Sequence, residues 1–204
     1  MLRSWGRSVS RQIDYCGEGP LDGAMARRLI QHVGAQPGFD YITSRRARGV
    51  RSLDARIGGL CAAARHGRRL LVLRDLDRDA PCAGALIASL LPQPEPHLCL
   101  RIAVRASEAW LLADRDGIAK ALAITKNLVP AAPDLLDNPK IRLAQIASQS
   151  SRLDIRRIFS GSLQERAGWT AEFIAEKWDI ARAVKSNGSA SLAKAVQRLR
   201  VLAT

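Results

Sequence analysis

Four apolar residues, Leu70-Leu71-Val72-Leu73, form the segment that most limits how this chain can fold. A continuous apolar run of this length is typical of a central strand that is buried on both faces of a parallel sheet. The run leads directly into an acidic segment, Asp75-Leu76-Asp77. Because parallel strands are joined by helical crossovers, this segment predicts an α/β fold with acidic side chains at one edge of its sheet.

The rest of the first half alternates strand-like and helix-like segments around this run. Strands are predicted at 9–16, 39–43, 69–73 and 97–104, and helices at 22–33, 53–64 and 82–91. Such alternation indicates a mostly parallel sheet flanked by helices. After Ser107 the pattern is helical, with one helix expected over 107–123 and an amphipathic one over 170–183. We therefore predict an α/β domain over residues 1–114 and a C-terminal helical extension over 115–204.

The charge of the chain points to its partners. The 204 residues carry a formal net charge of +13 at pH 7. A surface this basic attracts polyanions, of which nucleic acids are the commonest. About half of the excess lies from Lys140 onward, where 12 basic residues face 5 acidic ones. The alternative is an incidental charge, produced by arginine codons in a GC-rich genome.

The pattern of cysteines indicates the cellular compartment of the protein. None of the four lies in a C-x-x-C pair, and the last three fall in apolar surroundings (Cys16, Cys61, Cys82 and Cys99). We expect free thiols in a reducing cytoplasm and no structural zinc. The longest apolar run, 83–91, is too short to cross a bilayer, and no apolar region follows the basic start of the chain. We therefore expect neither a membrane segment nor a signal peptide.

Carboxylates follow two of the predicted strands. Glu18 comes just after the first strand, and Asp75 and Asp77 come after the central one. Functional residues of parallel sheets gather at the carboxyl ends of strands, so these side chains are expected to converge. Convergent carboxylates repel one another unless a cation joins them, and oxygen-only ligands select Mg²⁺ or Mn²⁺. Glu108, after the last strand, is a further candidate metal ligand.

Each of these residues also has a structural alternative. The aspartate pair can belong to a polar loop, and Glu18 or Glu108 can be a charge at the start of a helix. We expect Asp22 to be a helix N-cap residue and Asp79 to face solvent. Trp110 is expected in the core.

Arginines supply the candidate contacts to nucleic acid. Several surround Gly49 in a loop near the predicted acidic edge, and another ends the last strand (Arg45, Arg46, Arg48, Arg51 and Arg105). A basic loop at this place suits backbone phosphates, although it can also be a merely soluble loop. No phosphate-binding G-x-x-x-x-G-K-[ST] motif is present, so we do not expect ATP hydrolysis by this chain.

The combination of a Glu-Gly pair after strand one and an Asp-x-Asp after a later strand resembles the Toprim domain. This domain occurs in topoisomerases, primases and the nucleases called overcoming-lysogenization-defect proteins. The resemblance implies that Asp75 and Asp77 bind Mg²⁺ and that Glu18 is a metal ligand or a general acid/base. It implies a Toprim-like sheet over the first domain.

A closer resemblance is to one uncharacterised Toprim-like family, whose pattern covers nearly the whole chain. The matching segments are Glu18-Gly19-Pro20 with Asp22, 71–77, Arg105 with 108–114, Asp137-Asn138-Pro139-Lys140 and Ser189-Ala190-Ser191-Leu192. Two positions depart from it: Gly17 stands where a hydrophobic residue is usual, and Gly23 where an acidic one is frequent. Members are often encoded beside ABC- or SMC-like ATPases in what look like anti-phage defence systems.

Three functions follow as expectations. The first is a Mg²⁺- or Mn²⁺-dependent nuclease, or a nuclease-like effector, working with an ATPase partner. The second is a non-catalytic adaptor that docks on that ATPase, and the third is a basic nucleic-acid-binding protein without chemistry. The sequence leaves open RNA or DNA as substrate, and association of the chain with a second copy of itself.

Overall fold

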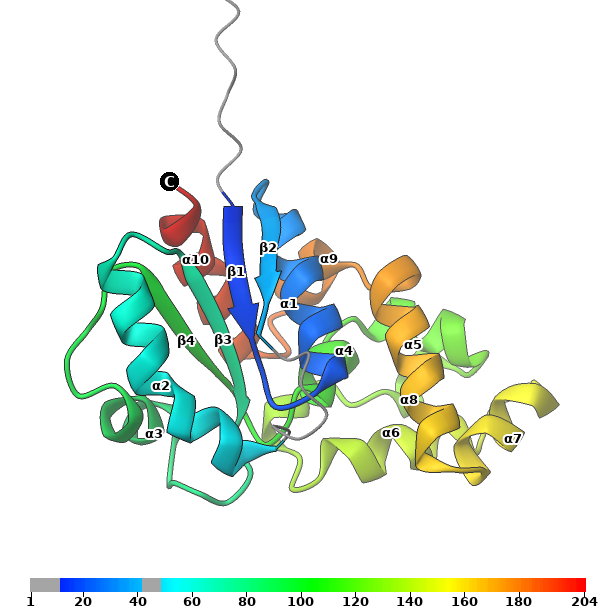
Figure 1. Ribbon diagram of the computed structural model, residues 1–204. Helices are drawn as coiled ribbons and strands as arrows, with labels where there is room; N and C mark the ends of the chain where they lie inside the picture. The colour runs from blue at the N-terminus through cyan, green and yellow to red at the C-terminus, as the bar shows by residue number, and fades with distance from the viewer. Residues whose placement is uncertain (1–11, 42–48) are drawn as a thin grey trace, which may run out of the picture.

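The structure, a computed structural model, describes residues 12–41 and 49–204. Within these residues, parallel strands form a four-stranded sheet with helices against both of its faces (Figure 1). The strands are β1 (Gln12–Cys16), β2 (Gln36–Asp40), β3 (Leu70–Asp75) and β4 (Leu98–Ala103), in the spatial order β2-β1-β3-β4. The predicted α/β fold with a parallel sheet is confirmed; positions 9–11 of the first predicted strand lie outside the described residues.

The central strand β3 is buried along its whole length. The helices of the first half are α1 (Pro20–His32), α2 (Val50–Arg65) and α3 (Ala83–Leu90). Leu70 and Val72 belong to the apolar core that includes side chains of α2 and α3. Leu71 and Leu73 point the other way, into the core that includes side chains of α1. The strand is continuously apolar because helices cover both faces of the sheet.

The second half of the chain is helical and packs on the α1 side of the sheet. Its elements are α4 (Glu108–Leu112), α5 (Arg115–Leu122), η1 (Lys126–Leu128), η2 (Pro133–Leu135), α6 (Pro139–Ala147), α7 (Leu153–Ser160), α8 (Leu163–Glu172), η3 (Phe173–Lys177), α9 (Ile180–Lys185) and α10 (Ala190–Ala203). One apolar core contains Ile13 and Leu71 of the sheet together with Trp110, Phe173 and Leu202. Buried contacts therefore cross the predicted division between residues 114 and 115, and separate domains stay a prediction.

Two helices that the apolar pattern predicted as continuous are interrupted. The helix expected over 107–123 breaks between α4 and α5, where Asp114 Oδ1 accepts a hydrogen bond from Gly117 N at 3.1 Å. The helix expected over 170–183 breaks after the π-helical segment η3, where Asp179 Oδ1 accepts from Arg182 N at 2.9 Å. In both places an aspartate side chain caps a new helix, which apolar periodicity does not reveal.

Strand β2 lies earlier in the chain than the predicted 39–43 and includes Pro37. A proline is tolerated here because β2 lies at an edge of the sheet. The pairing of β1 and β2 is irregular at this point, and Asp14 Oδ1 accepts a hydrogen bond from Phe39 N at 2.7 Å. The buried Asp14 side chain thus satisfies a backbone group that the irregular pairing leaves free.

Cys16, Cys61 and Cys99 are buried free thiols. The prediction of apolar surroundings was wrong for Cys82, which is exposed at the start of α3 with its sulfur accepting from Ala85 N at 3.4 Å. The segment that begins α3 lies at the surface, since Pro81 and Gly84 beside Cys82 are exposed as well. Over the described ranges, no helix has the length and apolar character needed to cross a membrane.

Candidate functional site

The candidate site lies where two neighbouring strands end. β1 and β3 are adjacent and parallel, but β1 continues into α1 on one face of the sheet and β3 continues toward α3 on the other. The strand order reverses at this pair, since β2 lies on one side and β4 on the other. Open parallel sheets bind ligands beyond the carboxyl ends of strands at such a reversal. Glu18 and Asp75 stand at these two ends.

The structure brings Glu18 and Asp75 together. The backbone N of Asp75 donates a hydrogen bond to Glu18 Oε1 at 3.0 Å. The Asp75 side chain is buried, and its Oδ1 accepts from Ser107 N at 2.8 Å. Its Oδ2 lies 3.1 Å from the Nζ of Lys140, at the start of α6. The segments that follow β1 and β4 and the first turn of α6 thus meet at Asp75, the last residue of β3.

Asp77 is exposed at the same edge and is held through its backbone. Its N donates to the carbonyl of Arg105 at 2.9 Å, and Arg105 Nη1 donates to the carbonyl of Asp77 at 2.8 Å. Both residues have positive φ, 45° for Asp77 and 52° for Arg105. Non-glycine residues hold this conformation only where surrounding contacts impose it. The loops after β3 and β4 therefore fix each other, with the Asp77 carboxylate free to face solvent.

Arg74 anchors the loop that carries the two aspartates. Its buried guanidinium lies 3.1 Å from Asp54 Oδ2 in α2 and 2.7 Å from Asp79 Oδ2, and it also donates to the carbonyl of Asp75. Asp79 was predicted to face solvent. It is partly exposed but pairs with Arg74, because a buried guanidinium requires several acceptors. This arrangement is a structural support for the site.

Asp22 organises the Glu18 loop from inside the first turn of α1. Its Oδ2 accepts hydrogen bonds from Glu18 N at 3.0 Å and from Gly19 N at 3.1 Å. The N-cap prediction for Asp22 needs correction: Gly19 is the N-cap residue, and Asp22 reaches back to it from the third helical position. This contact explains why position 17 is a glycine: a Cβ there would lie 2.5 Å from the Cβ of Asp22.

Asp22→Asn tests the cost of burying this carboxyl group. Burial, together with the charges of Asp75 and Glu18, raises the pKa of Asp22 to about 8. Because folding raises this pKa, the stability that the neutral acid provides is complete below about pH 4 and is lost as the pH rises through about 8. The amide stays neutral and keeps an oxygen for both backbone donors. We expect the free energy of unfolding of Asp22→Asn to exceed that of wild type by more than about 1 kcal/mol at pH 9, and to equal it near pH 4.

Urea unfolding in metal-free buffer at a series of pH values measures this difference. Asp137→Asn, at an exposed position, is the control and should change stability little throughout. A constant difference between Asp22→Asn and wild type over the whole pH range would contradict the expectation.

Glu108 and Lys140 complete the charge cluster. Among the described residues, Glu108 Oε2 has no hydrogen-bond partner although it is buried. Burial raises the pKa of Glu108 to about 7, against the opposing charge of Lys140. Burial also raises the pKa of Glu18 and of Asp75, and Asp77 adds to both increases. Although partial burial opposes it, Glu108 and Asp75 raise the pKa of the Lys140 ammonium. One lysine thus balances several crowded carboxyl groups.

A metal ion was predicted on Glu18, Asp75, Asp77 and Glu108. Within residues 12–41 and 49–204, no group of three or more His, Cys, Asp and Glu side chains is arranged to hold a metal ion. The donors are oxygens of the kind that Mg²⁺ prefers, and the unpartnered Glu108 Oε2 is a free ligand atom. However, both oxygens of Asp75 are engaged, so an ion at Oδ2 would take the place of Lys140 Nζ. The metal site stays a prediction.

Only part of the predicted basic loop lies within the described residues. Arg45, Arg46 and Arg48 lie outside the described residues. Gly49 N donates to the carbonyl of Glu18 at 2.9 Å, which brings the start of α2 beside the acidic edge. Arg51 is exposed in the first turn of α2, and Arg105 lies against Asp77. The two described arginines of the predicted set therefore lie at the same edge as the carboxylates.

Other segments of the predicted motifs have structural roles. Trp110 is fully buried, as predicted, and its Nε1 donates to Ser191 Oγ at 2.7 Å. Asn138 caps α6, as its sequence context predicted, with Oδ1 accepting from Ile141 N at 3.0 Å. The contact of Lys140 with Asp75 was missed. The sequence marked a helix start at this position, but nothing local showed that this helix begins beside β3.

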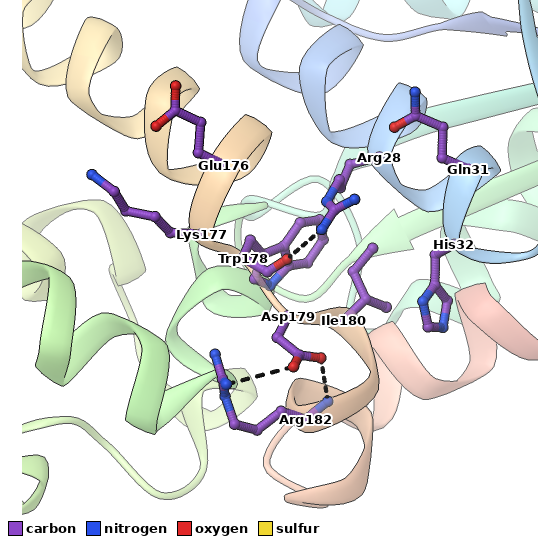
Figure 2. A pocket seen from close by; sticks show the side chains of 9 residues that line it. All are labelled: Arg28, Gln31, His32, Glu176, Lys177, Trp178, Asp179, Ile180 and Arg182. Carbon is purple, nitrogen blue, oxygen red and sulfur yellow. Dashed lines mark hydrogen bonds and ion pairs between the residues drawn. The ribbon is translucent and has the colours of Figure 1, made fainter.

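A polar pocket of about 450 Å³ lies at the far end of α1 from Asp22 (Figure 2). Arg182 pairs with Asp179, and Lys177 pairs with Glu172 nearby, whereas the buried Arg28 Nε and His32 Nε2 have no hydrogen-bond partner among the described residues. Arg28 donates only a long bond, 3.4 Å, to the carbonyl of Trp178. This pocket contains none of the residues that converge on Asp75.

Comparison with known proteins gives no relative. No protein-family model, curated protein or solved structure matches the chain.

Proposed function

We propose that this chain is a Toprim-like, metal-dependent nuclease that acts on nucleic-acid phosphodiesters in the cytoplasm. The observation that carries the proposal is the contact of Asp75 N with Glu18 Oε1 at the carboxyl ends of two adjacent parallel strands. Two acidic residues 57 positions apart meet where such sheets bind ligands. The resemblance of the Glu-Gly and Asp-x-Asp motifs to Toprim domains supports the same chemistry, and extends the proposal to a defence system with an ATPase partner.

The residues divide the chemistry between them. When bound, Mg²⁺ or Mn²⁺ would neutralise phosphate charge and lower the pKa of an attacking water. Asp75 and Asp77 would hold the ion, with Glu108 as a further ligand. Burial raises the pKa of Glu18, and a carboxyl group with a raised pKa suits a role in which it accepts and returns a proton. Lys140, half-exposed beside Asp75, would bind a phosphate oxygen once released from the carboxylate.

The basic surface supports binding of a nucleic-acid strand. Arg51 and Arg105 border the acidic edge, and the whole chain carries a net charge of +13. Contacts of this kind are made to phosphates and release counterions, so affinity should fall steeply as salt is added. The acidic centre would then receive a strand that the surrounding arginines hold.

The test is cleavage of RNA and DNA panels with Mn²⁺ or Mg²⁺, comparing wild type with Glu18→Gln and Asp75→Asn. Glu172→Gln and Asp154→Asn are matched controls, since both acids are exposed partners of surface ion pairs. Cleavage by wild type and controls, but not by the two site variants, supports the nuclease. Salt-sensitive binding without cleavage by any form would instead support a nucleic-acid-binding protein without chemistry.

The ion pair of Lys140 with Asp75 favours a second candidate, the non-catalytic adaptor. An ammonium that already neutralises the central carboxylate takes the place that a metal ion would occupy. In that case the chain would dock on its ATPase partner and leave phosphodiesters intact. Mn²⁺ binding separates the two candidates.

Lys140→Met is expected to raise Mn²⁺ affinity several-fold if the chain is a metalloenzyme. The ammonium and the ion compete for Asp75 Oδ2, so removal of the ammonium frees the ligand atom and removes a like charge. Calorimetry measures the change, with the exposed Lys185→Met as control for loss of one surface charge. Absence of Mn²⁺ heat in wild type and Lys140→Met alike would overturn the metalloenzyme, and co-purification with an ATPase would then select the adaptor.

A further inference from the structure

A pocket of about 600 Å³ opens beside Asp75 and the charged residues around it. Glu108 of α4 and Lys140 of α6 line it, and it continues between α6 and α8. Lys140 therefore belongs to both places, because its Nζ lies 3.1 Å from Asp75 Oδ2. A ligand in this pocket would be a direct neighbour of a phosphate bound at the acidic edge.

The walls of the pocket are largely apolar. Leu21, Leu143 and Phe159 line it together with Leu163 and Ile141. Leu163 is 81% exposed and Ile141 is 56% exposed, so large apolar side chains stand uncovered at the opening. Small-molecule sites combine such walls with a few polar groups, and exposed apolar surface around a hollow commonly marks a binding site.

Polar atoms without partners stand among these apolar walls. Two lining side chains, Glu108 and Arg166, each have a buried atom, Oε2 and Nε, that has no hydrogen-bond partner in the described part of the chain. The Asn138 side chain uses its oxygen to cap α6, which leaves its amide NH₂ for a ligand. The buried atoms of Glu108 and Arg166 are unfavourable unless a water or a ligand satisfies them, whereas Asn138 is exposed and its NH₂ can also bind water.

We propose that this pocket binds the base of the nucleotide whose phosphate lies at Asp75. A nucleobase has two apolar faces for the leucine and phenylalanine walls, and an edge with donors and acceptors for Asn138 and Arg166, while Glu108 stays available to the ion. It is also attached to its phosphate through a single sugar, which matches a pocket that shares Lys140 with the acidic site. This inference rests on the proposed function and specifies how the strand is held.

The test is binding of nucleoside 5′-monophosphates to the full chain in metal-free buffer. Ribose 5-phosphate is the matched ligand, because it keeps the phosphate and sugar and lacks the base. Saturation-transfer NMR should show the strongest transfer at the base protons, and calorimetry should give at least about tenfold weaker binding for ribose 5-phosphate. Such a difference corresponds to one buried ring rather than to the net charge of the protein.

Ala144→Phe fills the pocket from α6 and should abolish the preference for the base. Ala62→Phe, at an exposed position of α2, is the matched control and should leave it unchanged. Equal binding of both ligands, or the absence of binding by any nucleotide, would overturn the inference.

The outcome is separable from that of the proposed function. Glu18→Gln and Asp75→Asn should keep the base preference while they remove cleavage. If wild type cleaves a strand with single abasic positions as fast as an intact one, the base pocket fails and the nuclease stands. If the base preference appears but no cleavage occurs with any metal, the nuclease fails and the pocket stands.

Discussion

Asp75→Asn is expected to lower the rate of Mn²⁺-dependent cleavage at least about a hundredfold. Loss of a charged ligand at the centre of the site removes several kcal/mol of transition-state stabilisation, and about 1.4 kcal/mol corresponds to a factor of ten. The measurement is the single-turnover cleavage rate of the best substrate from the RNA and DNA panels. Asp154→Asn, an exposed aspartate in a surface ion pair, should retain the wild-type rate.

The same substitution should leave the fold intact. Burial raises the pKa of Asp75, so the ionised side chain is unfavourable in the folded chain and a neutral amide removes that cost. The amide oxygen still accepts from Ser107 N, and the half-exposed Lys140 regains water. We therefore expect an unchanged or higher urea midpoint. An active variant with an intact fold would place Asp75 outside the chemistry.

The meeting of Glu18 and Asp75 could be predicted from the sequence because each follows a strand. Once Leu70–Leu73 is identified as a central parallel strand, acidic residues after it and after a neighbouring strand must lie at one edge. The burial of Trp110 could also be predicted, because it follows from the apolar pattern. The start of α6 could be predicted because Asn138 is a local helix cap.

Contacts that depend on how distant elements pack could not be predicted. Lys140 is 65 positions from Asp75, and no periodicity connects a helix start in the second half to the end of β3. The role of Asp22 depends on the space that Gly17 leaves for its side chain. Asp114 lies within an apolar pattern typical of one long helix, yet the chain breaks there because partners from α9 reach it.

Asp114→Ala is expected to destabilise the protein by about 2–4 kcal/mol, because it leaves buried backbone donors without an acceptor and removes the partner of a half-buried arginine. Asp114 has no exposed surface, and its Oδ2 lies 2.8 Å from Arg182 Nη2 and accepts from Asp179 N at 3.0 Å. Its Oδ1 also caps α5 at Gly117 N. One carboxylate therefore joins α4, α5 and α9, and its loss leaves buried donors without acceptors. Urea unfolding measures the change, with the exposed Asp116→Ala as the control.

A double-mutant cycle with Arg182→Leu distinguishes the ion pair from the helix caps. In Asp114→Ala, Arg182 keeps only its 3.5 Å contact with Asp179, so removal of Arg182 should then cost less than in wild type. The free-energy changes of the two single variants should therefore sum to more than that of the double variant. Simple additivity would mean that Asp114 acts through the backbone donors Gly117 N and Asp179 N alone. Asp114 lies in the same predicted motif, 108–114, as Glu108. If Asp114→Ala is much less stable but its folded fraction still cleaves, this end of the motif stabilises the fold and takes no part in the chemistry. The catalytic proposal would then rest on the carboxylates at the ends of β1 and β3.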